Sequence, residues 1–164
     1  MYKSPIQLGA VVAVAMLVIA GCGGSGASTR ANSTFRASIG AYPLLNVVNV
    51  TQRALLTRYQ YTFSREVATD EELYYETNWL DATALDDERA IGVDFVRMRI
   101  IVSARPANRS PGSAGSMRTT MRAEVQYHLN ATDQWKEADM TEGREAYFDE
   151  IADYLENELR VMLR

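Results

Sequence analysis

Apolar and polar side chains alternate along four stretches of the chain, the pattern of half-buried β-strands. The clearest stretch runs from Met117 to Leu129, where Met121, Val125 and Tyr127 alternate with charged or polar residues. The other three predicted strands cover residues 59–64, 73–79 and 96–103. A turn over 68–71 makes a hairpin of the first two strands. A Pro-, Gly- and Ser-rich stretch over 105–116 predicts a long loop between the last two.

Helical spacing replaces this alternation on both sides of the strands. Residues 43–57 predict a helix that begins at Pro43, a residue that suits the first helical turn. Residues 141–164 predict a longer amphipathic helix, with Asp139 and Glu142 as its N-terminal capping signal. One face of this helix carries an apolar stripe of Phe148, Ile151, Leu155, Leu159 and Met162.

The order of these elements predicts an α+β fold. We expect a helix, a four-stranded antiparallel meander and a C-terminal helix, with both helices packed on one face of the sheet. The other face is expected to meet water, because the third and fourth strands alternate cleanly with polar residues. An acidic loop over 81–91 joins the second and third strands.

An apolar run near the N-terminus ends at the only cysteine of the chain. Lys3 precedes about 15 uncharged residues, and the sequence Ile19-Ala20-Gly21-Cys22 follows at the end of this run. This is the layout of a secretory signal, and the run is shorter than the roughly 20 residues that a membrane span needs. Residues 1–22 resemble the lipobox of bacterial lipoproteins.

The resemblance to lipoproteins implies cleavage between Gly21 and Cys22 and acylation of Cys22. A lipoprotein is held in the membrane by several acyl chains such as palmitate, which together give stable attachment. Gly23 stands where an aspartate would favour the inner membrane, so the resemblance implies an outer-membrane protein of the cell envelope that faces the periplasm. We expect residues 22–42 to form a flexible tether, and residues 43–164 to form a single domain.

The charge of the chain argues against a nucleic-acid partner. After cleavage, the chain would carry 16 basic and 21 acidic side chains, a net charge of about −5. Nucleic-acid-binding domains are usually basic. With Cys22 acylated, no thiol remains to form a disulfide, so the fold must be held by its core.

The sequence contains no combination of residues that predicts catalysis. His128 is the only histidine and lies on the polar side of a strand, where it is more often solvated or paired across the sheet. Asp86-Asp87-Glu88 lacks the ligand spacing of a calcium loop and is interpreted as a solvated acidic loop. No phosphate-loop, GxSxG or HExxH motif occurs. We therefore expect no enzymatic activity, no cofactor and no metal ion.

Three surfaces are candidates for binding. The first is the polar face of the sheet, represented by Arg97, Arg99, Arg118, Arg122 and His128. Its arginines suit a carboxylate or phosphate partner, but they could instead form cross-strand pairs with Glu76 and Glu124. The second candidate is an aromatic cluster that could be core or could line a ligand pocket: Tyr59, Tyr61, Phe63, Tyr75 and Trp79. The third is an unpaired sheet edge.

Residues 44–80 resemble the helix-grip domains of BamC-type accessory lipoproteins of outer-membrane assembly. The resemblance rests on a helix that leads into an aromatic strand and on the Thr77-x-Trp79 end of the next strand, although Tyr59 stands where a glycine is often found. It implies an envelope interaction or assembly module with envelope protein partners. The alternative is a protein that binds a lipid or small ligand in a pocket between helices and sheet.

Overall fold

The structure, a computed structural model, describes residues 32–107, 115–129 and 134–163, which belong to one compact unit. The predicted signal peptide over 1–21, its cleavage site and the lipidation site Cys22 lie outside the described residues. So does the centre of the predicted loop over 105–116.

The described residues form an α+β fold, as the sequence predicts. The described strands are β1 (Thr34–Pro43), β2 (Phe63–Ala68), β3 (Leu73–Thr77), β4 (Leu80–Thr83), β5 (Val93–Pro106), β6 (Ser116–Leu129) and β7 (Gln134–Lys136). The helices are α1 (Leu44–Gln52), which continues directly into the π-helical turn η1 (Arg53–Arg58), the short α2 (Asp86–Ala90) and α3 (Glu142–Val161).

The strands form one antiparallel sheet in the order β1-β6-β5-β3-β2. Strand β4 pairs with β5 beyond the end of β3, and β7 pairs with β6 beyond the start of β1. The expectation of a four-stranded meander was therefore wrong: the described sheet has seven strands, and β1 lies next to β6 rather than next to a sequence neighbour.

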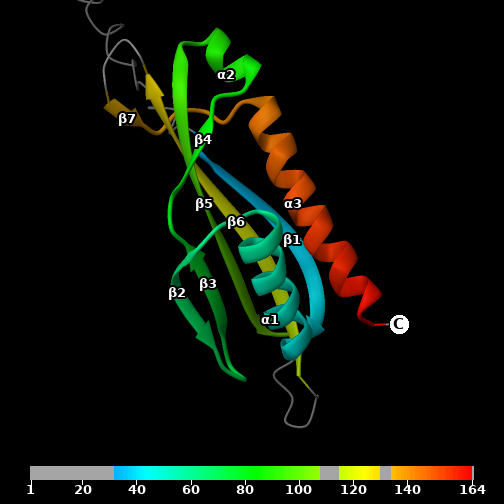
Figure 1. Ribbon diagram of the computed structural model, residues 1–164. Coiled ribbons are helices and arrows are strands. Elements are labelled where there is room, and N and C mark those ends of the chain that lie inside the picture. Colours follow the sequence, from blue (N-terminus) through cyan, green and yellow to red (C-terminus); the bar gives the residue numbers. More distant parts are fainter. Residues whose placement is uncertain (1–31, 108–114, 130–133, 164) are drawn as a thin grey trace, which may run out of the picture. The chain divides into compact units, whose positions relative to one another are not determined.

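Helices α1 and α3 lie side by side over one face of the sheet (Figure 1). The apolar stripe of α3 is buried there, with Phe148, Ile151 and Leu155 at 0–1% exposure. Val47 and Val50 of α1 join the same core. The sheet contributes the alternate residues that the sequence pattern predicts as apolar, so one face of the sheet is covered and the other meets solvent.

The first strand replaces part of the predicted tether. Residues 34–43 pair with β6, and Ile39 and Tyr42 are buried in the core. The pairing is interrupted by a bulge at Gly40, whose φ of 118° suits glycine. The tether prediction for 34–42 was wrong because it extended the Gly-, Ser-, Ala-, Thr- and Asn-rich composition that follows Cys22 into this segment, although Phe35, Ala37 and Ile39 alternate here with Arg36, Ser38 and Gly40.

The second correction concerns the strand predicted over 59–64. The helical segment extends to Arg58, and Gln60 then adopts a left-handed conformation with φ of 58°. Tyr61 donates its N–H to the carbonyl of Leu55, which closes the helix end. Strand β2 therefore begins only at Phe63, and the alternation of tyrosines before it belongs to the helix terminus.

The N-terminus of α3 is capped differently from the prediction. The hydroxyl of Thr141 accepts the N–H of Arg144 at 3.4 Å. Asp139, the predicted cap, accepts the N–H of Asn32 at 2.6 Å instead and connects the segment before α3 to the segment before β1.

Candidate functional site

The face of the sheet away from α1 and α3 carries the candidate binding residues, and we call it the open face. Strand register places its side chains in rows across the strands. It includes Arg36 and Ser38 of β1, Tyr74 and Glu76 of β3, Phe95, Arg97, Arg99, Ile101, Ser103 and Arg105 of β5, and Arg118, Thr120, Arg122, Glu124, Gln126 and His128 of β6. All five residues predicted as a binding face therefore lie on one surface.

Ion pairs hold the middle of the open face together. Arg99 lies between two carboxylates, at 2.7 Å from Glu76 on β3 and 2.7 Å from Glu124 on β6. Arg122 lies 3.1 Å from the same Glu124. Cross-strand pairing with Glu76 and Glu124, one of the two roles expected for the predicted arginines, thus accounts for Arg99, whereas Arg122 pairs with Glu124 along its own strand β6.

Aromatic side chains surround Arg97 at one end of the open face. Its guanidinium lies 5.3 Å from the ring centre of Trp79, just before β4, and 4.5 Å from that of Trp135 on β7. Its Nε donates to Oε1 of Gln126 at 2.8 Å. Arg97 is therefore held by stacking and by a hydrogen bond rather than by a carboxylate.

His128 belongs to the same end, which we call the aromatic end. Its ring lies 5.4 Å from that of Trp135 and 6.2 Å from that of Phe95. Its Nδ1 lies 2.8 Å from Oδ1 of Asp94 on β5, so of the two expectations for this histidine, solvation or pairing across the sheet, the structure shows pairing. Burial acts to raise the pKa of Asp94, but the hydrogen bonds from His128 and from backbone N–H groups hold that pKa below its ordinary value.

The opposite end of the open face has arginines without carboxylate partners. Arg36, Arg105 and Arg118 form no ion pair with any described residue. Register places Arg36 directly opposite Arg122, and Arg105 directly opposite Arg118. Like charges opposite one another destabilise a sheet. This end, the arginine end, is hollowed by two adjoining depressions of about 430 and 900 Å³.

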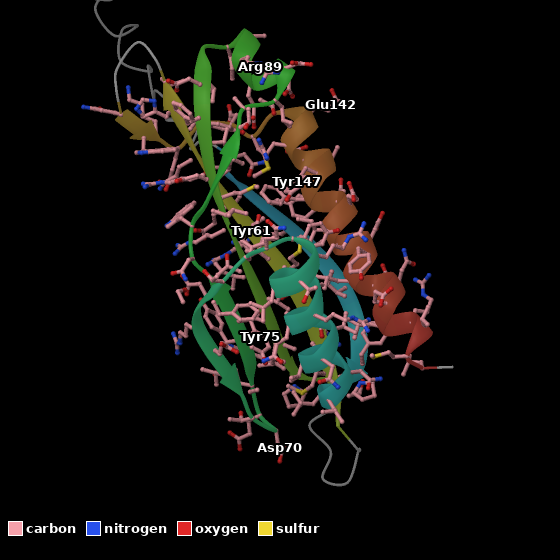
Figure 2. The ribbon with its side chains drawn as sticks, in the orientation of Figure 1. Tyr61, Asp70, Tyr75, Arg89, Glu142 and Tyr147 are labelled. Atoms are coloured by element: carbon pink, nitrogen blue, oxygen red, sulfur yellow. The ribbon has the colours of Figure 1, made fainter. Side chains whose placement is uncertain are left out.

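The predicted aromatic cluster is divided between the two faces. Tyr61 and Tyr75 are buried at 1% exposure between the sheet and the helices, where Figure 2 labels them. Trp79 lies on the open face instead, 4.8 Å from Arg99 as well as near Arg97. The chain bends between β3 and β4, so Trp79 leaves the alternation that the sequence extends through it. The five aromatics therefore cannot line one pocket.

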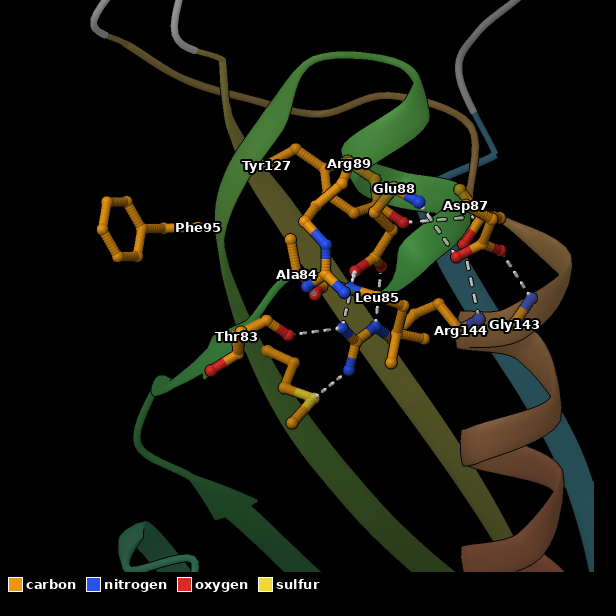
Figure 3. Close-up of polar contacts among 12 residues, drawn as sticks. Thr83, Ala84, Leu85, Asp87, Glu88, Arg89, Phe95, Tyr127, Gly143 and Arg144 are labelled. Atoms are coloured by element: carbon orange, nitrogen blue, oxygen red, sulfur yellow. Dashed lines mark hydrogen bonds and ion pairs between the residues drawn. The ribbon is translucent and has the colours of Figure 1, made fainter.

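The acidic segment Asp86-Asp87-Glu88 is not the solvated loop that the sequence predicts. It forms α2, and the Glu88 carboxylate is fully buried and accepts two hydrogen bonds of 2.8 Å from Arg144 of α3 (Figure 3). Asp87 accepts the N–H of Gly143 at 2.9 Å. A Cβ at Gly143 would lie 2.8 Å from Oδ2 of that carboxylate, so a larger residue here would have to displace the Asp87 side chain. Through Glu88 and Asp87, α2 is therefore attached by hydrogen bonds to the first turn of α3.

Burial of Arg144 does not remove its charge. Desolvation acts to lower the pKa of Arg144, but the hydrogen bonds and the negative charge of Glu88 raise it above the ordinary value. The pair is a structural contact inside the covered side of the molecule. Nowhere in the described part of the chain do three or more His, Cys, Asp or Glu residues gather to hold a metal ion.

Several residues of the open face were missed by the sequence analysis, among them Arg36, Phe95 and Trp135. Arg36 was assigned to the tether, Phe95 lies just before the strand predicted from 96, and Trp135 follows the last predicted strand. Phe95 is 58% exposed and Trp135 is 37% exposed. The alternation of Phe35, Ala37 and Ile39 could have revealed Arg36, whereas no local pattern places Trp135 beside Arg97.

Comparison with known proteins assigns no family. No protein-family model matches the chain, and no curated protein is significantly similar to it. The resemblances to lipoproteins and to BamC-type domains therefore stay predictions. Among the described residues, no helix combines the length and the apolar character needed to cross a membrane.

Proposed function

We propose that this chain is a non-enzymatic, lipid-anchored envelope protein that binds another envelope protein through the aromatic end of its open face. The observation that carries the proposal is Arg97 between Trp79 and Trp135, beside the exposed ring of Phe95. Tryptophan and arginine are the residues most often responsible for binding energy in protein interfaces.

The aromatic end is ordered before any partner arrives. Arg97 is fixed by two rings and by Gln126, and His128 is fixed by Asp94. Side chains that are already immobile lose little conformational entropy on binding. The large apolar rings also remain in contact with water on a surface that no described element covers, so a partner that covers them gains hydrophobic stabilisation.

Membrane attachment is proposed from the lipobox resemblance at Cys22. Acyl chains on Cys22 would hold the domain at the membrane, and Gly23 favours the outer membrane with the domain in the periplasm. The proposed role is then that of an interaction or assembly module for envelope components. It involves no cofactor and no nucleic acid.

The ligand-binding alternative receives less support from the geometry. It requires an apolar pocket between helices and sheet lined by Tyr61, Phe63, Tyr75 and Trp79. Tyr61 and Tyr75 are packed within the core, and Trp79 lies on the opposite face. The two depressions described above also lie on the open face.

Site-specific crosslinking in the native envelope tests the proposal. A photo-crosslinking side chain at Phe95 is expected to capture one defined protein, which mass spectrometry identifies. The same crosslinker at Leu45, which is 68% exposed on α1, serves as the matched control. We expect Trp135→Ala to reduce capture at Phe95 at least tenfold, because it removes one of the two rings that hold Arg97. Capture of the same mixture of abundant membrane proteins by the crosslinkers at Phe95 and at Leu45 would refute the proposal.

A further inference from the structure

A row of hydroxyl groups crosses four strands at the arginine end of the open face. Register aligns Ser38 of β1 with Thr120 of β6, Thr120 with Ser103 of β5, and Ser103 with Tyr74 of β3. The next row toward the aromatic end begins with Arg36 and Arg122, directly opposite one another. All six side chains line the depression of about 430 Å³.

The charges around this depression do not balance. Glu124 is shared between Arg99 and Arg122, and Glu76 is also engaged by Arg99, so two carboxylates neutralise two guanidinium groups. Arg36 remains without a carboxylate among the described residues, and no acidic residue lines the described wall of the depression. Glu71 and Glu72 line only the adjoining depression, together with Arg105 and Arg118.

We propose that Arg36 and Arg122, with the hydroxyls of Ser38, Ser103 and Thr120, form a binding site for a phosphoryl group. A phosphoryl group offers several acceptor oxygens and no required donor, and this site offers guanidinium and hydroxyl donors. Arginine binds phosphate through two parallel hydrogen bonds. A bound anion would also relieve the repulsion between the two opposed arginines.

The hydroxyl row gives the site a preference for tetrahedral anions. Ser103 and Thr120 lie 3.1 Å apart and bond to one another. Both hydroxyls can rotate toward a ligand, because hydroxyl hydrogens turn freely about the C–O bond. The two arginines engage one edge of the phosphoryl group, and the hydroxyls are available to a further oxygen. A planar carboxylate has only two oxygens and cannot occupy both sets of donors in this way.

The phosphoryl group could belong to a lipid headgroup or to a free phosphate. Arg36 lies 14 residues after Cys22, and a chain of this length spans at most roughly 50 Å. If Cys22 is acylated, the site stays within reach of membrane phosphates. The site itself is independent of the proposed protein-binding role, because it lies at the opposite end of the open face.

Calorimetric titration of the full chain carrying Cys22→Ala with pyrophosphate, in phosphate-free buffer, tests the site. We expect saturable binding that Arg36→Gln weakens about tenfold or more, as the loss of a charge-assisted hydrogen bond predicts. Arg160→Gln removes the same charge from α3 and should change the affinity less than twofold. Ser38→Ala is a second variant that leaves every charge in place and should also weaken binding. Thermal unfolding checks that each variant remains folded.

Vesicles distinguish the two sources of phosphate. Co-sedimentation of the same Cys22→Ala chain with phosphatidylglycerol vesicles, lost in Arg36→Gln and kept in Arg160→Gln, identifies a lipid headgroup as the ligand. Saturable binding of pyrophosphate without vesicle binding identifies a free phosphate. The site is refuted if neither probe binds, if Arg36→Gln and Arg160→Gln have equal effects, or if the tricarboxylate tricarballylate binds as tightly as pyrophosphate.

Discussion

Arg144 joins three parts of the molecule through one side chain. It binds the buried carboxylate of Glu88, contacts the carbonyl of Thr83 at 3.5 Å, and approaches the sulfur of Met98 at 3.5 Å. Glu88 in turn accepts the N–H of Leu85 at 2.7 Å. The pair therefore fixes the loop that connects β4 to β5 against the first turn of α3.

We expect Arg144→Met to lower the free energy of unfolding by about 3–5 kcal/mol, because it leaves the charge of Glu88 buried without its partner. Arg160→Met is the control, since it removes an exposed pair with Glu156 on the same helix and should cost no more than about 1 kcal/mol. Urea denaturation measures both variants. Equal losses would show that Glu88 does not depend on Arg144.

The Asp87 carboxylate gives stability that depends on pH. The N–H of Gly143, followed by other hydrogen bonds, holds the pKa of Asp87 below its ordinary value. The contribution is therefore present above the unfolded-state pKa of about 3.9 and is lost as the pH falls through the lower folded-state pKa. We expect thermal unfolding below about pH 4 to depend less steeply on pH in Asp87→Asn than in the wild type.

Asp86→Asn is the control for this pH dependence. Asp86 is 97% exposed and pairs with Arg89 instead of with α3, so this substitution removes a carboxylate without disturbing Gly143. If Asp86→Asn reduced the pH dependence of thermal unfolding as much as Asp87→Asn, the contact between Asp87 and Gly143 would not be the cause of that dependence.

Arg36 illustrates a residue whose position costs stability. It faces Arg122 across β1 and β6 and has no carboxylate partner among the described residues. We expect Arg36→Gln to leave the free energy of unfolding unchanged or to raise it by about 0.5 kcal/mol in phosphate-free buffer, because like charges opposite one another are destabilising. A loss above about 1 kcal/mol in a urea titration would assign Arg36 a structural role instead.

At the scale of elements, the end of η1 depends on one unusual backbone conformation. Tyr59 donates its N–H to the carbonyl of Ala54 in a π-helical bond, and Gln60 then turns the chain with φ of 58°. Left-handed conformations cost a residue other than glycine about 1–2 kcal/mol.

We expect Gln60→Gly to raise the free energy of unfolding by about 0.5–1 kcal/mol, since glycine adopts this conformation without strain but loses more entropy on folding. Gln60→Val should lower it by about 1 kcal/mol or more, because a branched side chain fits this region poorly. Equal effects of glycine and valine in urea denaturation would contradict the argument.

The elements that could be predicted from the sequence are those with long periodic patterns. The alternation in β5 and β6 and the apolar stripe of α3 persist over many residues, so their faces are defined locally. In strand β1 the alternation covers only Phe35, Ala37 and Ile39 before the bulge at Gly40 interrupts it, and the strand pairs with β6 far along the chain. The open face was predicted through Arg97, Arg99 and Arg122, whereas its contacts with Trp79 and Trp135 depend on a bend and on β7, which have no local signal.

The buried ion pair between Glu88 and Arg144 could not be predicted either, because it too has no local sequence signal. Glu88 and Arg144 are 56 residues apart and each lies in a locally polar segment. Nothing near either residue distinguishes it from a solvated charge. Their burial follows from the packing of α3 against the end of the sheet, which is a property of the whole fold.

At the scale of the molecule, charge is divided between two sides. The solvent side of α3 carries acidic residues, among them Glu142, Glu145, Asp149, Glu150 and Asp153. The open face on the other side of the sheet carries an excess of arginine. An anionic surface would attract the sheet and repel the helix, so the protein would approach such a surface in one orientation.

The proposed anchor is tested on the whole chain. We expect Cys22→Ala to leave the domain folded and to move it from the membrane fraction to the soluble fraction, because the acyl chains supply most of the membrane affinity. Sedimentation of envelope fractions at high salt measures this, since salt screens any attraction between the arginine end and lipid headgroups. Continued sedimentation of Cys22→Ala under these conditions would show that another segment attaches the protein.

The position of β1 in the sheet determines the order in which the domain can assemble. Thr34 pairs with Glu124, 90 residues further along the chain, and α3, which packs on β1, comes later still. Strand β1, the first among the described residues to leave the ribosome or a translocation channel, therefore waits for the long strand β6. Contacts between distant residues form slowly. During this interval β1 has no strand to pair with, so a chain cut short before β6 has no route to the native fold.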